Sequence, residues 1–206
     1  KTVEDVKSSD LDVINGVLAE YDKLSTKAKT ALANEKKHLD ELLAAAEAKK
    51  KAEEEEAEAQ AAANKFKADY ESVLSETVAS VDLADKEAVN KAIEDYSKLS
   101  DRAKEIVKTD YDNLAELQKE LNRLENEIAD FKKLNSLILS KTVEDVKSSD
   151  LDVINGVLSQ FEKLTENAKE ALAAEKKHLD ELLVAAEAKK KAEEEEARVQ
   201  AEVTNF

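Results

Sequence analysis

The chain repeats itself, and this repeat limits the possible folds more than any other feature of the sequence. Residues 1–66 align without gaps to residues 141–206, with 50 of 66 positions identical. A more divergent copy lies between them, in which Thr77 and Leu99 match Thr2 and Leu24. A fixed internal period is typical of chains that string together several copies of one supersecondary unit. We therefore expect three copies of one small unit.

Composition and periodicity predict that the unit is helical. The sequence has no Pro, two Gly and 39% charged residues, a profile typical of long helices and coiled coils. Ser9 or Asp10 is expected to cap a short helix, with Asp12 completing a capping box. Apolar residues then recur at three- and four-residue steps, which predicts one buried stripe in each copy. The stripes are Ile14, Val17, Leu18, Tyr21 and Leu24; Val89, Ala92, Ile93, Tyr96 and Leu99; and Ile154, Val157, Leu158, Phe161 and Leu164.

A longer helix is expected to follow each short one. Ser25, Ser100 and Thr165 stand directly after the stripes, where a hydroxyl can cap the next helix while the chain reverses. The spacing from Leu114 to Phe131 alternates between three and four residues, which favours a packed helix. By contrast, residues 47–65 combine charge blocks with Ala and predict a solvated single helix. We expect long helices over about 26–81, about 101–146 and from about 165 to the end.

These expectations define an all-α fold of elongated tandem three-helix bundles joined by long continuous helices. Residues 1–63 are predicted to form a partial N-terminal repeat with its connecting helix. Residues 64–128 would form a central three-helix bundle, and residues 129–206 a C-terminal three-helix bundle with a trailing helix. The predicted object is a rod, because each long helix would extend about 70 to 80 Å at about 1.5 Å per residue.

The segments YDKLSTKAK, YSKLSDRAK and FEKLTENAK resemble the spectrin-like three-helix repeats of Gram-positive bacterial surface proteins, including streptococcal adhesin stalks. The short middle helix and the absence of Trp depart from the spectrin repeat. The resemblance implies an extracellular, cell-surface spacer or stalk that extends a binding region from the cell. Two alternatives stay open: a helical adhesin module that itself binds a host or cell-surface protein, and a cytoplasmic spectrin-like scaffold.

The residues that could carry chemistry are better explained by structure. His38 and His178 could bind a metal with Asp40 or Glu41, but a single His beside carboxylates lacks paired ligand spacing. The run Glu53 to Glu56 favours a solvated helical face over a cation site. We predict no catalytic, cofactor-binding or metal residues, and no enzyme. The net charge of −16 argues against nucleic acid as a partner.

The sequence also predicts how the chain meets its surroundings. No stretch reaches the roughly 20 apolar residues of a membrane span, and none has the features of a signal peptide. The absence of Cys leaves the compartment open. Tyr21, Tyr96 and Phe161 share one core position, and Phe66, Tyr70 and Phe206 are expected to pack on the connecting helices. Because both terminal bundles would be incomplete, we expect their helices to fray or to associate with another chain.

Overall fold

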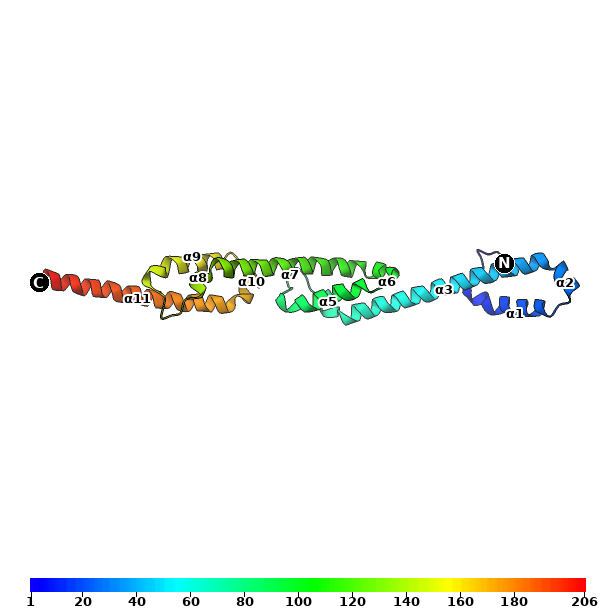
Figure 1. Cartoon of the computed structure of the whole chain (residues 1–206), viewed down its shortest axis with the longest axis horizontal. Coiled ribbons are helices and arrows are strands. Elements are labelled where there is room, and N and C mark those ends of the chain that lie inside the picture. Colours follow the sequence, from blue (N-terminus) through cyan, green and yellow to red (C-terminus); the bar gives the residue numbers. More distant parts are fainter. The chain divides into compact units, whose positions relative to one another are not determined.

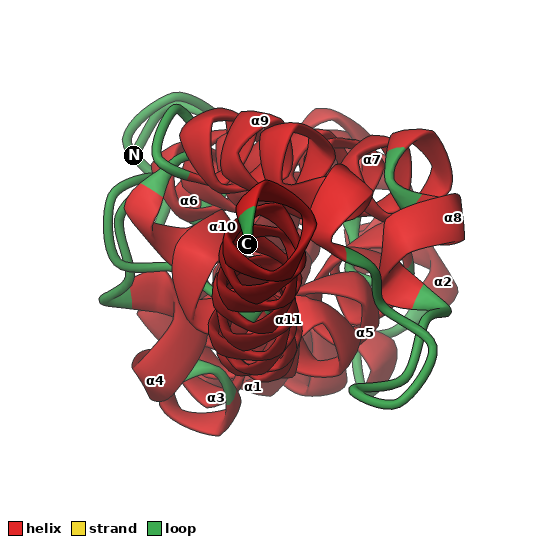
Figure 2. Ribbon diagram, turned by 90° about the vertical axis from the view of Figure 1, so that its left-hand side faces the viewer, coloured by secondary structure: helices red, strands yellow, loops and turns green.

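A computed structural model describes residues 1–206, and every regular element in it is a helix. No strand occurs, and Figure 2 shows only helices and the loops that connect them. The predicted all-α fold class is therefore confirmed. Its physical basis is the sequence itself, which lacks Pro and is rich in Ala, Leu, Lys and Glu, the strongest helix formers.

The helices follow the order of the three copies (Figure 1). In the first copy and its connection they are η1 (Ser8–Asp10), α1 (Leu11–Asp22), α2 (Thr26–Ala31), α3 (Ala33–Asp69) and α4 (Glu71–Leu74). The middle copy contains η2 (Leu83–Asp85), α5 (Lys86–Ser97), α6 (Asp101–Ile106), α7 (Lys108–Leu134) and α8 (Ser136–Leu139). The last copy contains η3 (Ser148–Asp150), α9 (Leu151–Phe161), α10 (Glu166–Ala171) and α11 (Ala173–Asn205).

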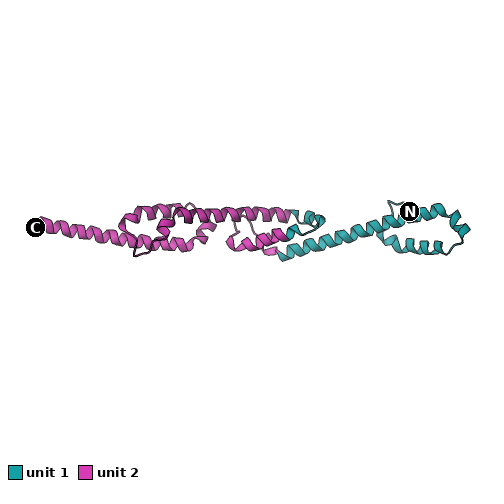
Figure 3. Cartoon of the chain, in the orientation of Figure 1, with its two compact units in different colours: residues 1–69, 95–108 teal, residues 70–94, 109–206 magenta.

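The chain forms two compact units, coloured separately in Figure 3. The first comprises Lys1–Asp69 with Asp95–Lys108, and the second comprises Tyr70–Glu94 with Thr109–Phe206. The long helices α3 and α11 carry the same sequence at their starts and lie in different units. Equivalent residues can therefore be compared in two settings within one chain.

The second unit has the larger core, built from α7, α9 and α11. Leu124, Ile128 and Phe131 of α7 pack with residues of α9, α10 and α11, and Leu172, Leu179 and Leu182 are all fully buried. Burial of each such side chain is worth about 1.5 to 3 kcal/mol relative to its exposure. The stripe predicted for the last copy is confirmed, since Ile154, Val157 and Phe161 all belong to this core.

The first unit has a small core between α1 and α3. Its buried members are Val6, Ile14, Leu42 and Ala46. Further along, α3 packs against α6, where Ala103 is fully buried. The stretch between these two contacts, residues 50–58 of α3, is exposed throughout. This confirms the solvated part of the predicted single helix, whereas Ala59 and Ala63 at its far end are buried.

The long helices are interrupted where the sequence predicts continuity. Each interrupting residue leaves the helical backbone region, with φ between −120° and −102° and ψ between 12° and 22°. The five positions are Leu32, Tyr70, Val107, Asn135 and Leu172. Backbone hydrogen bonds continue across them; the Leu32 N–H, for example, donates to the Ala28 carbonyl at 3.0 Å. Such bends are invisible to hydrophobic periodicity, because the residue pattern is unchanged.

The predicted long helices also end earlier than expected. They stop at Leu74 and Leu139, and not near Val81 and Val146. In the last copy the following turn is held by side chains: the Thr142 hydroxyl accepts from the Asp145 N–H at 3.2 Å and donates to the Asp145 carboxylate at 2.8 Å. Thr and Asp compete in this way with helical backbone bonding, which explains the early stop.

Two of the predicted caps need correction. Ser25 and Ser100 accept the N–H groups of Ala28 and Ala103, as predicted. Thr165 makes no such cap, because its hydroxyl donates to Glu127 at 2.7 Å. At the start of the short helices the capping carboxylate is Asp10 or Asp150, and not Asp12. It reaches back to the N–H three residues earlier, at 2.8 Å in both copies.

Candidate functional surface

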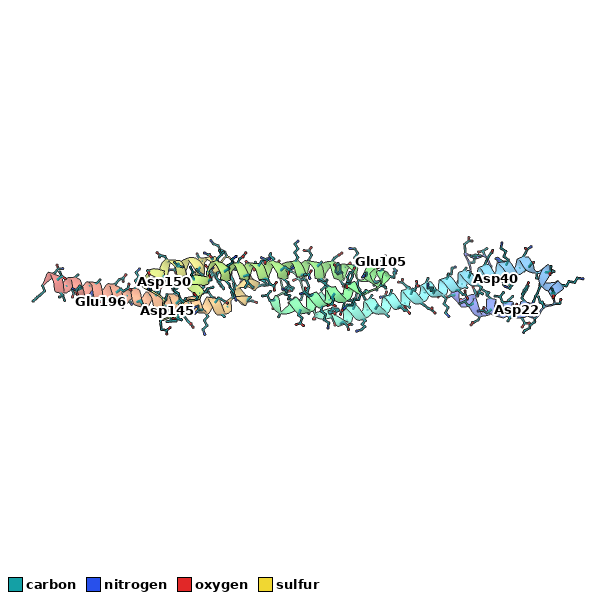
Figure 4. The ribbon with its side chains drawn as sticks, in the orientation of Figure 1. Asp22, Asp40, Glu105, Asp145, Asp150 and Glu196 are labelled. Atoms are coloured by element: carbon teal, nitrogen blue, oxygen red, sulfur yellow. The ribbon has the colours of Figure 1, made fainter.

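In the first and last copies, the ten residues before the short helix are fastened onto the long helix by side chains. We call this arrangement, in residues 1–10 and 141–150, the clasp. In the last copy Lys189 Nζ donates to the carbonyls of Glu144 and Val146, each at 2.6 Å, and Ser148 Oγ donates to Glu193 at 2.5 Å. Figure 4 labels Asp145 and Asp150 on this segment. The clasp thus provides hydrogen-bond donors for backbone carbonyls that lie outside the helices and have no helical N–H partner.

Both histidines belong to the clasp. His38 Nε2 lies 3.0 Å from the Lys1 carbonyl, and His178 Nε2 lies 3.0 Å from the Lys141 carbonyl. The ring nitrogen must be the donor, because a carbonyl only accepts. In the middle copy the equivalent residue is Asn113, whose amide donates to the Glu76 carbonyl at 3.3 Å. The property shared by all three copies is a hydrogen-bond donor, which favours a structural role over metal binding.

The first two carboxylates that follow His38 in the sequence have lysine partners of their own. Asp40 lies 2.6 Å from Lys36 Nζ, and Glu41 lies 3.8 Å from Lys37 Nζ. No group of three or more His, Cys, Asp or Glu side chains is arranged to hold a metal ion.

The acidic run Glu53 to Glu56 is likewise divided among different partners. Glu53 accepts from Ser8 Oγ at 2.6 Å, and Glu54 and Glu55 pair along the helix with Lys50 and Lys51 at 3.8 and 3.5 Å. Glu56 accepts from Arg102 of α6, with Nε at 2.5 Å. The run therefore ties the solvated helix to its neighbours and does not converge on one point.

The electrostatics of these carboxylates favour ionisation. The hydrogen bonds from Lys141 and from the Lys147 N–H lower the pKa of Asp150. For Glu127, burial raises the pKa, but the bonds from Thr165 and Arg123 outweigh it and the net pKa is lowered. Every carboxyl group whose pKa departs from its ordinary value departs downward. A general acid at neutral pH needs the opposite shift.

Aromatic residues mark the places where a long helix meets the short helix of the next copy. The rings of Phe66 and Tyr96 lie edge to face, with centroids 6.3 Å apart and an interplanar angle of 64°. Phe131 and Phe161 repeat this contact at 6.0 Å and 70°. The predicted packing is thus confirmed for Phe66. It is wrong for Phe206, whose side chain is fully exposed because nothing in the chain lies against it.

The first copy exposes an apolar face that is covered in the last copy. Val17 is 45% exposed and Leu32 is 38% exposed, whereas their equivalents Val157 and Leu172 are 3% and 0% exposed. Residues of α7 supply the cover in the last copy. We call the uncovered surface the open face; it consists of Val17, Tyr21, Leu24, Ala28 and Leu32.

Comparison of the chain with protein-family models, curated proteins and solved structures gives no match. None of the helices combines the length and the apolar character that crossing a bilayer requires. Evidence about function therefore comes from the clasp, the exposed helix and the open face alone.

Proposed function

We propose that the chain is a spacer or stalk segment of a cell-surface protein, built from tandem three-helix bundles joined by long helices, without catalytic activity. The observation that carries the proposal is the solvated stretch of α3, residues 50–58. It stays helical without any core, in a helix of 37 residues that packs at both ends. A helix in that position contributes length and stiffness rather than binding surface.

Two further features support a mechanical role. Lys50 and Lys51 pair with Glu54 and Glu55 one turn later, and such pairs each stabilise an isolated helix by about 0.2 to 0.5 kcal/mol. The clasp fixes the turn at the base of the short helix with the same bonds in two copies. The ammonium groups of Lys49 and Lys189 donate to backbone carbonyls of the same chain, so they are not available to bind a ligand.

The resemblance to Gram-positive surface repeats extends the proposal to an extracellular location. Two alternative functions are compatible with the same helices. In one, the chain is an adhesin module that binds a host protein; in the other, it is a cytoplasmic scaffold that binds a cytoskeletal partner. Saturable binding of the isolated chain to an extracellular-matrix or serum protein would favour the adhesin alternative over a bare spacer.

Stiffness can be measured directly within α3. Since the sequence has no Cys, spin labels at introduced Asn34→Cys and Asn64→Cys report a single distance. Thirty residues of helix predict about 45 Å between the labelled positions, and an insertion of eleven Lys/Glu/Ala residues after Glu55 predicts about 16 Å more. Labels at Glu116→Cys and Lys133→Cys in α7 are the control, and their distance should not change.

A narrow distribution that lengthens with the insertion supports the spacer. A broad or shortened distribution in α3, with the α7 control intact, would show that the solvated stretch bends, and the proposal would then fail.

A further inference from the structure

The solvated stretch of α3, residues 50–58, connects two packed regions that have no buried residue in common (Figure 1). The core of α1 and α3 ends at Ala46. The next buried residue of α3 is Ala59, where this helix packs with the middle copy. No side chain between these two residues is buried. The helical backbone is therefore the main connection between the first copy and the residues that follow it.

The exposure of this stretch does not arise from a neighbouring copy that the sequence lacks. The middle copy is present beside α3, and its buried contacts with this helix begin at Ala59. In the last copy the preceding helix α7 is present too, and the core that it forms with α11 ends at Ala186. Residues 190–198 of α11, which are equivalent to residues 50–58, are nevertheless exposed. The stretch is thus uncovered with either neighbour in place.

A helix without buried side chains opens more readily than a packed one. An endoprotease acts on a locally unfolded segment, so the rate of cleavage follows the population of the open form. Opening a packed helix exposes its buried side chains, and each of these lowers the open population by about tenfold to hundredfold. Opening residues 50–58 exposes none. This segment therefore combines a helical average structure with a comparatively large open fraction.

The lysines of this stretch determine which class of protease fits it. The side chains of Lys50 and Lys51 are 58% and 78% exposed. Their ion pairs with Glu54 and Glu55, at 3.8 and 3.5 Å, are exposed to solvent and hold them only weakly. A serine endoprotease whose specificity pocket contains a carboxylate binds a Lys side chain at the bond that it cuts. The stretch therefore presents suitable side chains where opening is easiest.

We propose that residues 50–58 form a cleavage site for a Lys-directed serine endoprotease, which cuts after Lys50 or Lys51. In the cut after Lys51 the protease serine attacks the Lys51 carbonyl carbon, and the bond to the Ala52 nitrogen breaks. That nitrogen takes up a proton and becomes a new amino terminus. Water then hydrolyses the acyl-enzyme and leaves the Lys51 carboxylate. The proposal uses the rare open form of α3 and does not depend on the stiffness of its average structure.

A cut at this site separates the first copy from the rest of the chain. All buried residues of the first core lie before the cut. The hydrogen bond from Ser8 to Glu53 crosses the cut, but it is exposed and contributes little. By contrast, a cut in the turn after Lys163 would leave two pieces that share the core of α7, α9 and α11. Release of a fragment is therefore expected from the solvated stretch and not from such a turn.

The test is limited digestion of the full chain with a small amount of a Lys-specific serine endoprotease, followed by intact-mass spectrometry. The bonds after Lys50 and Lys51 should be cut at least about tenfold faster than those after Lys132 and Lys133. The latter are also adjacent lysines, but they lie in α7 beside the buried Phe131. On size-exclusion chromatography of the digest, the first copy should elute apart from the fragment that contains α7.

A pair of glycine variants tests whether local opening sets the rate. Ala57→Gly weakens the solvated stretch at an exposed position, where Gly is less favourable than Ala by about fivefold in the helix equilibrium. Cleavage after Lys50 and Lys51 should accelerate by about that factor. Ala115→Gly makes the same change at an exposed position of α7 and should leave the rate after Lys50 and Lys51 unchanged. Circular dichroism of both variants checks that the fold is retained.

Three results would overturn the proposal. The first is a rate after Lys50 and Lys51 that exceeds the rate after Lys132 and Lys133 by less than about tenfold. The second is an acceleration by Ala57→Gly that Ala115→Gly reproduces, or no acceleration by either variant. The third is a first copy that stays bound to the rest of the chain after the cut. Each of these results is compatible with a narrow spin-label distance in α3, so the cleavage site and the spacer are tested independently.

Discussion

Leu172 and Leu32 provide a matched test of how much the cover supplied by α7 contributes to stability. They occupy the same position in two copies, at the bend between the first turn and the long helix, within nearly identical sequence. Leu172 is fully buried, whereas Leu32 is 38% exposed. Leu172→Ala removes side-chain carbons from a closed core and leaves a cavity, for which about 3 kcal/mol is expected. Leu32→Ala removes a partly solvated side chain and should cost about 1 kcal/mol.

Hydrogen exchange followed by mass spectrometry is the suitable assay, because a chain of two compact units need not unfold in one step. Peptides from α1 and α9 differ in mass but share nearly the same sequence, so their intrinsic exchange rates are comparable. Protection of α9 should fall by about 150-fold in Leu172→Ala, and protection of α1 by about fivefold in Leu32→Ala. Equal losses in the two copies would refute the assignment of the extra stability to α7.

Two further predictions concern the clasp. Because the pKa of Asp150 is lowered in the folded chain, its contribution to stability is complete above its unfolded pKa and is lost as the pH falls through the folded value. The protection factor of residues 141–147, in which the exchange rate is corrected for its intrinsic pH dependence, should therefore fall on acidification, and Asp150→Asn should remove that fall; an unchanged fall in the variant would contradict it. His178→Asn should preserve the clasp, as Asn113 does in the middle copy, whereas His178→Ala should accelerate exchange of the same residues by about fivefold. Zinc that protected this segment only when His178 is present would instead indicate metal binding.

Much of the fold can be predicted from the sequence, because the unit is repeated and its apolar residues recur at helical spacing. The positions of the three short helices, the buried stripe of the last copy and the capping role of Ser25 all follow from spacing that the copies share. The stripe of the first copy was predicted to be buried, but Val17 and Leu24 are exposed there. The bends at Leu32 and Leu172 do not, because an apolar residue satisfies the periodic pattern whether or not the backbone turns there. The early helix ends were also missed, since Thr142 and Asp145 look like ordinary helix-surface residues until their side chains close on the backbone.

The role of the histidines was within reach of the sequence, although the specific contact was not. Aligning the middle copy places Asn113 at the position of His38 and His178, and Asn shares with His the ability to donate a hydrogen bond but is a poor zinc ligand. What the sequence could not supply is the acceptor, because the Lys141 carbonyl lies 37 residues away and comes close only once the turn has folded. The exposure of Phe206 was missed for a similar reason, since burial depends on a partner surface.

The connection after the first copy is ten residues longer than the connection after the middle copy. Three positions of the repeat hold different residues in these two cases. Where the next copy follows closely, after the middle one, these positions are Leu83, Leu124 and Ile128, and all three pack in the core shared with the last copy. In the first and last copies the same positions hold Ser, Lys and Glu, which form the clasp.

The carbonyl bonded by Lys49 or Lys189 also has an equivalent in the middle copy. There the Val81 carbonyl accepts from Asn167 of the following copy at 2.6 Å. The Ser, Lys and Glu of the first and last copies thus make their contacts within one copy. Leu83, Leu124 and Ile128 of the middle copy instead pack against residues of the copy that follows. The last copy also carries this Ser, Lys and Glu, and residues 190–205 of its helix α11 are exposed in the same way as residues 50–58 of α3.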